Sequence, residues 1–201
     1  MSTASGLAPP ARRNDLPHYL THLGLHGVGV EVGVREGTYA GVVLAGWSGT
    51  MLLVDPWRQL DDYNDPANVA DDQQEKRFER ALKVARKHSP RAHLLRMFSH
   101  EAARLLRPES LDFVYLDAQH TLPGFRQDLH LWYPLLKHGG LFAGHDYFDG
   151  SFDMGARQPS DDPNGEFPCQ VKSTVDAFAA AVHRQIRSTT EDKFPSWFII
   201  K

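Results

Sequence analysis

The stretch Val30-Glu31-Val32-Gly33-Val34-Arg35-Glu36-Gly37 decides the fold. The segment 28–32 is short and rich in β-branched valine, which is typical of a buried strand. Residues 39–44 carry apolar side chains at helical spacing. The two glycines between these segments predict a tight turn. The stretch therefore predicts strand, glycine turn and helix, which is the unit from which parallel α/β sheets are built.

The same alternation of strand and helix continues along the chain. Further strands are predicted at 51–54, 92–95, 111–116 and 141–143. Further helices are predicted at 73–88, 123–136 and 171–181. No helix separates the last two strands, 185–189 and 197–200, so we expect them to pair antiparallel. The chain therefore predicts a three-layer, Rossmann-like α/β fold with a seven-stranded sheet, mostly parallel with an antiparallel last strand.

Length and composition indicate a single domain. The chain has 201 residues, of which 41% are hydrophobic, so one core can form without disulfides. We expect a flexible N-terminus over 1–13 and the domain over 14–201. Cys169 is the only cysteine, which excludes an internal disulfide and a thiolate metal cluster.

Charge and hydropathy predict which partners the protein has. The formal net charge of -3 arises from 22 basic and 25 acidic residues, so bulk electrostatics does not favour a nucleic acid partner. No stretch approaches the roughly 18 apolar residues of a membrane span. We therefore expect no nucleic acid partner, no membrane partner and a cytoplasmic location.

The glycine turn is the predicted cofactor site. Gly33 and Gly37 let the backbone approach a ligand closely where a strand enters a helix. Glu31 would repel a pyrophosphate and the G-x-G-x-x-G spacing is absent, so a positively charged ligand fits better. Asp55 ends the second strand, where a carboxylate can take the hydroxyls of a ribose. The alternative is that the glycines only make a turn and Asp55 only caps a loop.

A second cluster of polar residues follows the fourth and fifth predicted strands. Asp117 and His120 follow the fourth strand, and His145 and Asp146 follow the fifth. Because adjacent parallel strands end at the same edge of a sheet, we expect these side chains to converge. Asp117, His145 and Asp146 then form a candidate divalent metal site, with His120 free to act as a base. Alternatively, His145 bonds the backbone and Asp146 caps a loop.

Two loops flank this edge. The acidic segment 56–72, which contains Asp61, Asp62 and Asp65, is predicted to be a solvated surface loop. Residues 148–168 are rich in Gly, Pro, Asp and Ser and too long for an ordinary connection, so they are a candidate lid. Cys169 has no partner at an interpretable spacing and is interpreted as incidental to the chemistry.

With these motifs in place, the chain from Val28 to Lys201 resembles the class I S-adenosylmethionine-dependent methyltransferases. It is most similar to the small branch with D-x-x-H after strand four and G-H-D-Y after strand five. The resemblance implies that S-adenosylmethionine is the cofactor and that Ser99 lies near its adenine. The cofactor-binding residues implied are Glu31, Gly33, Gly37, Asp55, Ser99 and Asp117.

The resemblance extends to metal-dependent sugar and natural-product O-methyltransferases, and it implies a Mg²⁺ site. In those enzymes a pair of carboxylates after strand five joins the equivalent of Asp117, whereas this chain has His145 and Asp146. The catalytic residues implied are His120 as base, Asp117 and His145, and the metal ligands are Asp117, His145 and Asp146.

The predicted function is transfer of a methyl group to a hydroxyl of a small-molecule acceptor, a sugar or a secondary metabolite. Two alternatives stay open at this point. A metal-dependent hydrolase could use Asp117, His120, His145 and Asp146 but would leave Glu31 and the glycine turn without a purpose. A non-catalytic cofactor-binding module would need no base. A short helix predicted after Asp15 and the long loop over 148–168 are the expected places for a homodimer contact.

Overall fold

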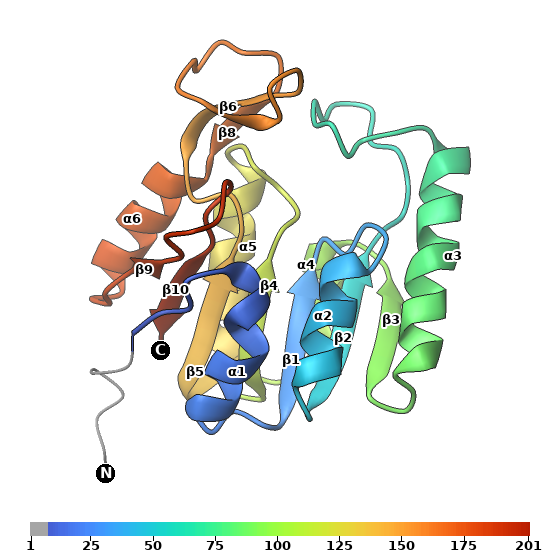
Figure 1. Ribbon diagram of the computed structural model, residues 1–201, viewed down its shortest axis with the longest axis vertical. Helices are drawn as coiled ribbons and strands as arrows, with labels where there is room; N and C mark the ends of the chain where they lie inside the picture. Colours follow the sequence, from blue (N-terminus) through green and yellow to red (C-terminus); the bar gives the residue numbers. More distant parts are fainter. Residues whose placement is uncertain (1–7) are drawn as a thin grey trace.

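A seven-stranded sheet forms the centre of the computed structural model, which describes residues 8–201 (Figure 1). In spatial order its strands are β3 (Ala92–Arg96), β2 (Thr50–Asp55), β1 (Val28–Val32), β4 (Leu111–Leu116), β5 (Leu136–Gly144), β10 (Trp197–Ile200) and β9 (Arg187–Ser188). β1 to β5 pair in parallel, whereas β10 is antiparallel to both β5 and β9. The predicted fold and the predicted pairing of the last two strands are confirmed.

Helices cover both faces of this sheet. They are α1 (Leu16–His22), α2 (Thr38–Gly46), α3 (Asp71–Lys87), α4 (Ser99–Arg104), α5 (Gly124–Trp132) and α6 (Val171–Ala181). Successive side chains along a strand point to opposite faces of the sheet and so enter two different cores. In β4, Phe113 and Tyr115 pack with α1, α2 and α3, while Val114 and Leu116 pack with α4, α5 and α6. β4 is buried along its whole length, as expected for a central parallel strand.

A second, smaller sheet occupies the segment predicted to be a lid loop. It consists of β6 (Asp149–Asp153), β7 (Gln158–Ser160) and β8 (Pro168–Gln170), all antiparallel, in the order β7-β6-β8. Figure 1 shows it above the carboxyl ends of the central strands. The segment is therefore an ordered lobe of the domain rather than an irregular loop.

The helix predicted over 123–136 is too long. α5 ends at Trp132, a short 3-10 helix, η3 (Tyr133–Leu135), contains Pro134, and β5 already begins at Leu136. Gly139 lies inside β5, where the pairing with β4 jumps from Leu136 to Leu141. It has a φ of +78°, so the glycine makes an irregularity in a strand instead of ending a helix.

The N-terminal segment is attached to the domain earlier than predicted. Residues 1–7 of the expected flexible start lie outside the described residues. The carbonyl oxygen of Ala11 accepts hydrogen bonds from the backbone of Thr190 and Glu191, at 3.1 and 3.0 Å, and Arg12 pairs with Glu191. The domain therefore includes residues 11–13. Within residues 8–201, no helix combines the length and the apolar character needed to cross a membrane.

Gly33 sits at the tightest contact between the first turn and β4. Its φ is +89°, and a Cβ atom built on it would lie 2.0 Å from the carbonyl oxygen of Asp117. Gly41, in the interior of α2, is different, because a Cβ atom there would meet only Val84 Cγ1 at 3.5 Å.

These two glycines give a matched pair of variants. Gly33→Ala should lower the free energy of unfolding by at least about 3 kcal/mol, because both the backbone conformation and the backbone of Asp117 reject a side chain. Gly41→Ala should leave stability unchanged or raise it by up to about 1 kcal/mol, since alanine favours a helix. Chemical denaturation measures both, and equal stability of the two variants would contradict the packing described here.

Candidate functional site

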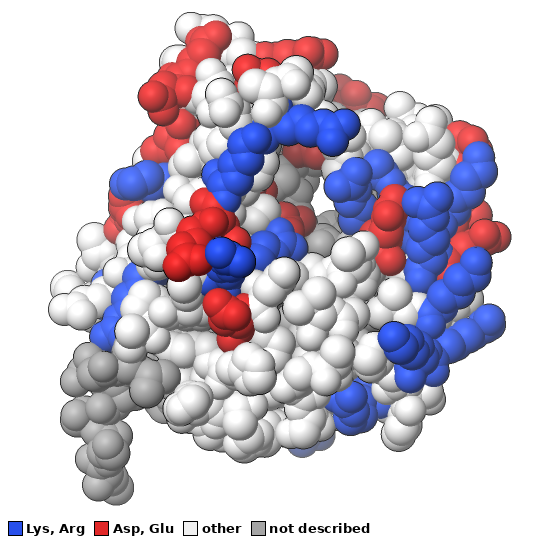
Figure 2. All heavy atoms as spheres, viewed as in Figure 1, with Lys and Arg blue, Asp and Glu red and all other residues white. Residues whose placement is uncertain are grey.

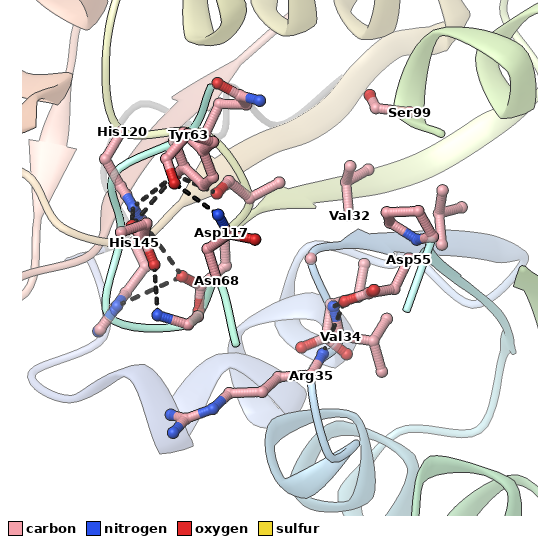
Figure 3. A pocket seen from close by; sticks show the side chains of 18 of the residues that line it. Val32, Val34, Arg35, Asp55, Tyr63, Asn68, Ser99, Asp117, His120 and His145 are labelled. Carbon is pink, nitrogen blue, oxygen red and sulfur yellow. Dashed lines mark hydrogen bonds and ion pairs between the residues drawn. The ribbon is translucent and has the colours of Figure 1, made fainter. Parts of the chain in front are cut away.

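One cavity of about 550 Å³ opens at the carboxyl ends of the central strands, a size typical of small-molecule and cofactor sites. On the face shown in Figure 2 the surface is hollowed between the small sheet and α3. The cavity is lined by nearly all the predicted site residues: Glu31, Gly33, Asp55, Ser99, Asp117, His120, His145 and Asp146. Figure 3 shows the side chains of Asp55, Ser99, Asp117, His120 and His145 around it.

Gly37 is the predicted site residue that does not line the cavity. It is the N-cap of α2, with a φ of +76°, and a Cβ atom on it would lie 3.1 Å from Ala81 Cα in α3. Its position therefore indicates a role in packing α2 against α3.

Glu31 is a buried carboxyl at the floor of the cavity. Its side chain extends from β1, the residue is 1% exposed, and its Oε2 atom has no hydrogen-bond partner within the described chain. Burial, followed by the nearby charge of Asp117, raises its pKa well above the ordinary value. A buried polar atom without a partner is costly, so Glu31 is suited to receive a donor from a ligand.

Asp55 holds the loops of the cavity together. Its Oδ2 accepts hydrogen bonds from the backbone of Val34 and Arg35, at 3.0 and 2.9 Å, and its Oδ1 accepts one from Trp57 at 2.7 Å. Arg35 and Trp57 both have left-handed φ values, 54° and 44°, which these bonds stabilise. Burial raises the pKa of Asp55. Since a carboxylate offers roughly four acceptor positions, about one remains for a ribose hydroxyl.

Ser99 belongs to a polar contact that the sequence did not predict. Phe98 takes the N-cap position of α4, and Ser99 is the first helical residue. Its hydroxyl donates to Asp128 Oδ1 at 2.5 Å and accepts from Trp132 Nε1 at 2.8 Å. Asp128 lies on the inward face of α5 between Phe125 and Trp132, and its polar character on that face was the available signal.

Burial raises the pKa of Asp128 to about 6, against 3.8 for a free side chain. The folded state therefore holds this proton more tightly than the unfolded chain, and the stability that it contributes is lost as the pH rises from about 4 to about 6. Asp128→Asn removes the buried charge and keeps an acceptor for Ser99.

We expect Asp128→Asn to be more stable than the wild-type protein by up to about 3 kcal/mol at pH 8, and by less than about 1 kcal/mol at pH 4. Chemical denaturation at the two pH values measures the difference. A variant that is less stable by the same amount at both would show that the charge of Asp128 costs nothing.

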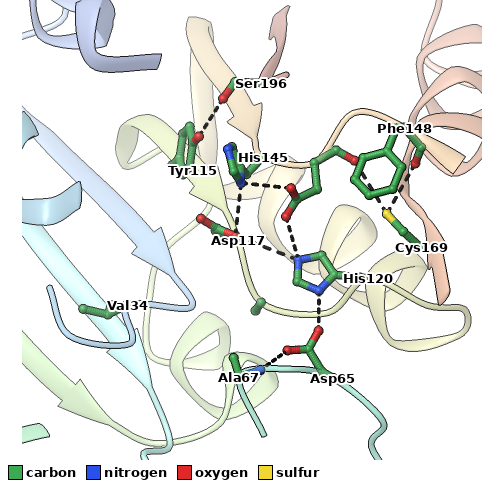
Figure 4. A network of polar contacts seen from close by, with 12 residues as sticks. Val34, Asp65, Ala67, Tyr115, Asp117, His120, His145, Phe148, Cys169 and Ser196 are labelled. Carbon is green, nitrogen blue, oxygen red and sulfur yellow. Dashed lines mark hydrogen bonds and ion pairs between the residues drawn. The ribbon is translucent and has the colours of Figure 1, made fainter. Parts of the chain in front are cut away.

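His120 lies at the centre of an acidic cluster (Figure 4). Its Nδ1 is 2.7 Å from Asp65 Oδ2, and its Nε2 is 3.1 Å from Asp146 Oδ2 and 3.9 Å from Asp117 Oδ1. Nε2 makes these ion-pair contacts but has no hydrogen-bond partner within the described residues. Burial acts to lower the pKa of His120, but the carboxylates of Asp117, Asp146 and Asp65 outweigh it and raise the pKa well above its ordinary value.

The same cluster contains a set of ligand atoms suited to a cation. One ligand atom from each of Asp117, His120 and Asp146 lies within 4.8 Å of the others. His145, the predicted third ligand, is adjacent: its Nδ1 is 3.2 Å from Asp146 Oδ1 and 3.8 Å from Asp117 Oδ1. The structure thus brings all four residues together but does not leave His120 free, because carboxylates face both of its nitrogens.

Asp65 is the residue of this cluster that sequence reasoning missed. We expected it in a solvated loop, whereas it is 8% exposed and also accepts a hydrogen bond from the Tyr63 hydroxyl at 3.1 Å. Although burial acts to raise its pKa, the hydrogen bond and charge of His120 lower it. The available signal was weak, because several aspartates in the loop share the same local pattern.

Asp146 adopts a backbone conformation that L residues rarely take, with a φ of 54°. It is 4% exposed, and although burial acts to raise its pKa, the imidazoles of His145 and His120 lower it. Its charge is therefore maintained inside the domain by two imidazoles. Cys169, by contrast, is fully buried, and burial raises the pKa of its thiol to about 12, which suits a structural role.

The sheet order, the antiparallel β10 and the position of the cavity define a class I methyltransferase fold. The sequence profile of a methyltransferase domain family matches residues 30–147, and the chain belongs to that family. No curated protein sequence matches the chain.

Solved structures agree with this fold. An O-methyltransferase from Bacillus cereus, crystallised with S-adenosylhomocysteine, is similar with a TM-score of 0.57 and 13% identity, over 97% of this chain and 83% of that one. A protein from Staphylococcus aureus suggested to be a caffeoyl-CoA O-methyltransferase has a TM-score of 0.64 and 12% identity, over 97% and 85%. The 1,6-didemethyltoxoflavin-N1-methyltransferase of Burkholderia thailandensis has a TM-score of 0.57 and 14% identity, over 93% and 74%.

Proposed function

We propose that this protein transfers a methyl group from S-adenosylmethionine to a hydroxyl group of a small molecule, assisted by a divalent cation. One observation carries the proposal: the same cavity holds the unpartnered Oε2 of Glu31 and the cluster of Asp117, His120 and Asp146. Asp117 interacts with groups in both parts, so a methyl donor and an acceptor bound there would meet beside it. Such alignment is the main requirement of a direct displacement.

The cofactor end of the cavity suits S-adenosylmethionine. When bound, this cofactor supplies a methyl group activated by a positively charged sulfonium. The carboxyl groups of Glu31 and Asp117 favour positive charge there. We assign the remaining acceptor position of Asp55 to the ribose and the surroundings of Ser99 to the adenine. The Bacillus cereus O-methyltransferase of similar fold was crystallised with S-adenosylhomocysteine, which supports the choice of cofactor.

The end of the cavity at Asp117, His120 and Asp146 suits a hard or borderline divalent cation such as Mg²⁺. Such cations are bound by carboxylate oxygens and imidazole nitrogens, which these residues offer. A bound cation would supply a Lewis acid that lowers the pKa of an acceptor hydroxyl. We assign Asp117 and Asp146 as ligands, with His145 beside them. The third residue of the set, His120, is assigned the role of base.

His120 is the proposed base. The carboxylates of Asp117 and Asp146 raise its pKa, and a bound cation would offset their charge and so favour the neutral imidazole. A neutral imidazole within reach of the acceptor hydroxyl can take its proton. Asp65 holds Nδ1 and so directs Nε2 toward the acceptor hydroxyl.

The wall next to this centre is aromatic, which bears on the acceptor. The ring of Phe152 lies 5.1 Å from that of His120, and the ring of Phe194 lies 6.4 Å from that of His145, centroid to centroid. Both line the cavity with Met154. This surface favours a flat apolar body that carries a hydroxyl, so we propose a secondary metabolite rather than a free sugar.

The distribution of charge on the surface bears on whether the protein binds a nucleic acid. Basic side chains of α3 gather at one edge of the molecule in Figure 2, but acidic side chains lie among them. Arg80 pairs with Glu36 and Lys76 with Asp72, which reduces the positive field available to a nucleic acid. We therefore propose a protein without a nucleic acid partner, located in the cytoplasm, and leave the homodimer contact as a prediction for α1 and the small sheet.

Methyl transfer from radiolabelled S-adenosylmethionine to a panel of catechols, phenols and sugars, with and without Mg²⁺, tests the proposal. We expect transfer to a phenolic hydroxyl that EDTA abolishes and Mg²⁺ restores. His120→Ala should lower kcat about 10²- to 10⁴-fold while leaving S-adenosylhomocysteine binding intact. His138→Ala, at an exposed histidine, is the control. Transfer unaffected by both EDTA and His120→Ala would refute the metal and the base, and absence of S-adenosylhomocysteine binding would refute the cofactor.

Asp65→Asn tests the positioning of His120. The amide keeps the shape of the side chain but removes its charge and can reverse which imidazole nitrogen carries the proton. We expect kcat to fall by about 10²-fold or more, with KM for S-adenosylmethionine unchanged. Asp62→Asn, at an exposed aspartate of the same loop, should match the wild-type protein. A rise in KM with unchanged kcat would show that Asp65 only supports the loop.

A further inference from the structure

Arg13 reaches the cavity from the N-terminal segment rather than from the sheet. It begins the short 3-10 helix η2 (Arg13–Asp15) before α1 and lines the cavity. Its guanidinium carbon lies 4.0 Å from the ring centroid of Tyr39. The backbone is held on both sides: its N–H donates to Asp192 at 2.6 Å, and its carbonyl accepts from the Tyr39 hydroxyl at 3.0 Å. Arg13 is thus a positioned side chain rather than a loose surface residue.

The guanidinium donors of Arg13 are not saturated. The closest carboxylate oxygen, Asp117 Oδ2, is 3.8 Å away, which is beyond hydrogen-bond distance. Within the described chain the Arg13 side chain contacts the rings of Tyr39 and Tyr115, at 4.0 and 5.9 Å from the centroids, and makes this long ion pair. None of these contacts uses the five N–H donors of the guanidinium, whose fork matches a carboxylate. The group is 23% exposed, so part of it remains accessible to a ligand.

Glu31 supplies a carboxyl acceptor in the same cavity. Its Oε2 is buried without a partner, and Glu31 and Arg13 line the same cavity. A cation with free donors and a carboxyl with a free acceptor form a pair that complements an α-amino acid, whose ammonium and carboxylate sit on one carbon.

We propose that Arg13 binds the carboxylate of the amino-acid end of S-adenosylmethionine while Glu31 accepts from its ammonium group. This inference rests on the proposed cofactor and adds the residue that anchors its amino-acid end. The other arginines around the cavity are placed differently: Arg77 donates to the Ala67 carbonyl, and Arg58 lies over Phe98, near the proposed adenine site. Arg35 is exposed at the rim.

Arg12 is a matched control in the same segment. Its guanidinium pairs with Glu191 at the surface, where the two side chains are 64% and 54% exposed, and it does not line the cavity. Arg12→Gln and Arg13→Gln therefore remove the same charge from adjacent positions. Only the second removes it from the proposed site.

The experiment is calorimetric titration of the wild-type protein, Arg13→Gln and Arg12→Gln with three ligands. These are S-adenosylhomocysteine, its analogue lacking only the carboxylate, 5′-(3-aminopropylthio)-5′-deoxyadenosine, and 5′-methylthioadenosine, which lacks the whole amino-acid end. Arg13→Gln should weaken S-adenosylhomocysteine binding by about 10- to 100-fold and leave the other two affinities unchanged. Arg12→Gln should match the wild-type protein with all three ligands.

Two results would overturn the inference while leaving the proposed function intact. One is wild-type affinity of Arg13→Gln for S-adenosylhomocysteine, and the other is equal weakening of all three ligands, which would indicate a damaged cavity. Arg13→Lys, which keeps the charge but not the fork, should bind S-adenosylhomocysteine with intermediate affinity. A cooperative thermal unfolding transition checks that this variant is folded. A wild-type protein that binds none of the ligands would overturn the proposed function and this inference together.

Discussion

The close approach of the first turn to β4 is the constraint on which the site depends. Gly33 leaves room for the backbone of Asp117, whose N–H donates to the Val32 carbonyl at 2.8 Å, while the N–H of Gly33 donates to the Val54 carbonyl at 2.9 Å. These contacts bring the ends of β1, β2 and β4 to one level. Carboxyl groups that follow or end these strands are then forced into one cavity, where they must be paired, protonated or bound to a ligand.

The carboxyl groups that line the cavity form two halves with chemically different surroundings. Burial raises the pKa of Glu31 and Asp55, whereas the imidazoles of His120 and His145 lower that of Asp146 despite its burial. One half therefore holds carboxyls that respond to a positively charged ligand, and the other holds carboxylates that stay ionised. An arrangement of this kind suits a sulfonium cofactor beside a cation-assisted acceptor.

Residues expected to bind cofactor also hold the protein together. Asp55 fixes three backbone amides, and Gly37 allows α2 to pack on α3. The predicted cofactor role of Asp55 and its alternative as a loop-capping residue are compatible, because one carboxylate has acceptor positions for both. A variant of Asp55 therefore changes the unliganded protein as well as any binding, whereas Glu31, whose Oε2 has no partner, reports on a ligand more directly.

The sequence by itself determined the alternation of strand and helix, the antiparallel end of the sheet and the convergence of Asp117, His120, His145 and Asp146. These follow from local periodicity and from the rule that parallel strands end at a common edge. Only the tertiary structure decided that Asp65 and Arg13 join them, because neither lies in a periodic segment. Contacts distant in the sequence place both: His120 holds Asp65, and Asp192 holds the backbone of Arg13.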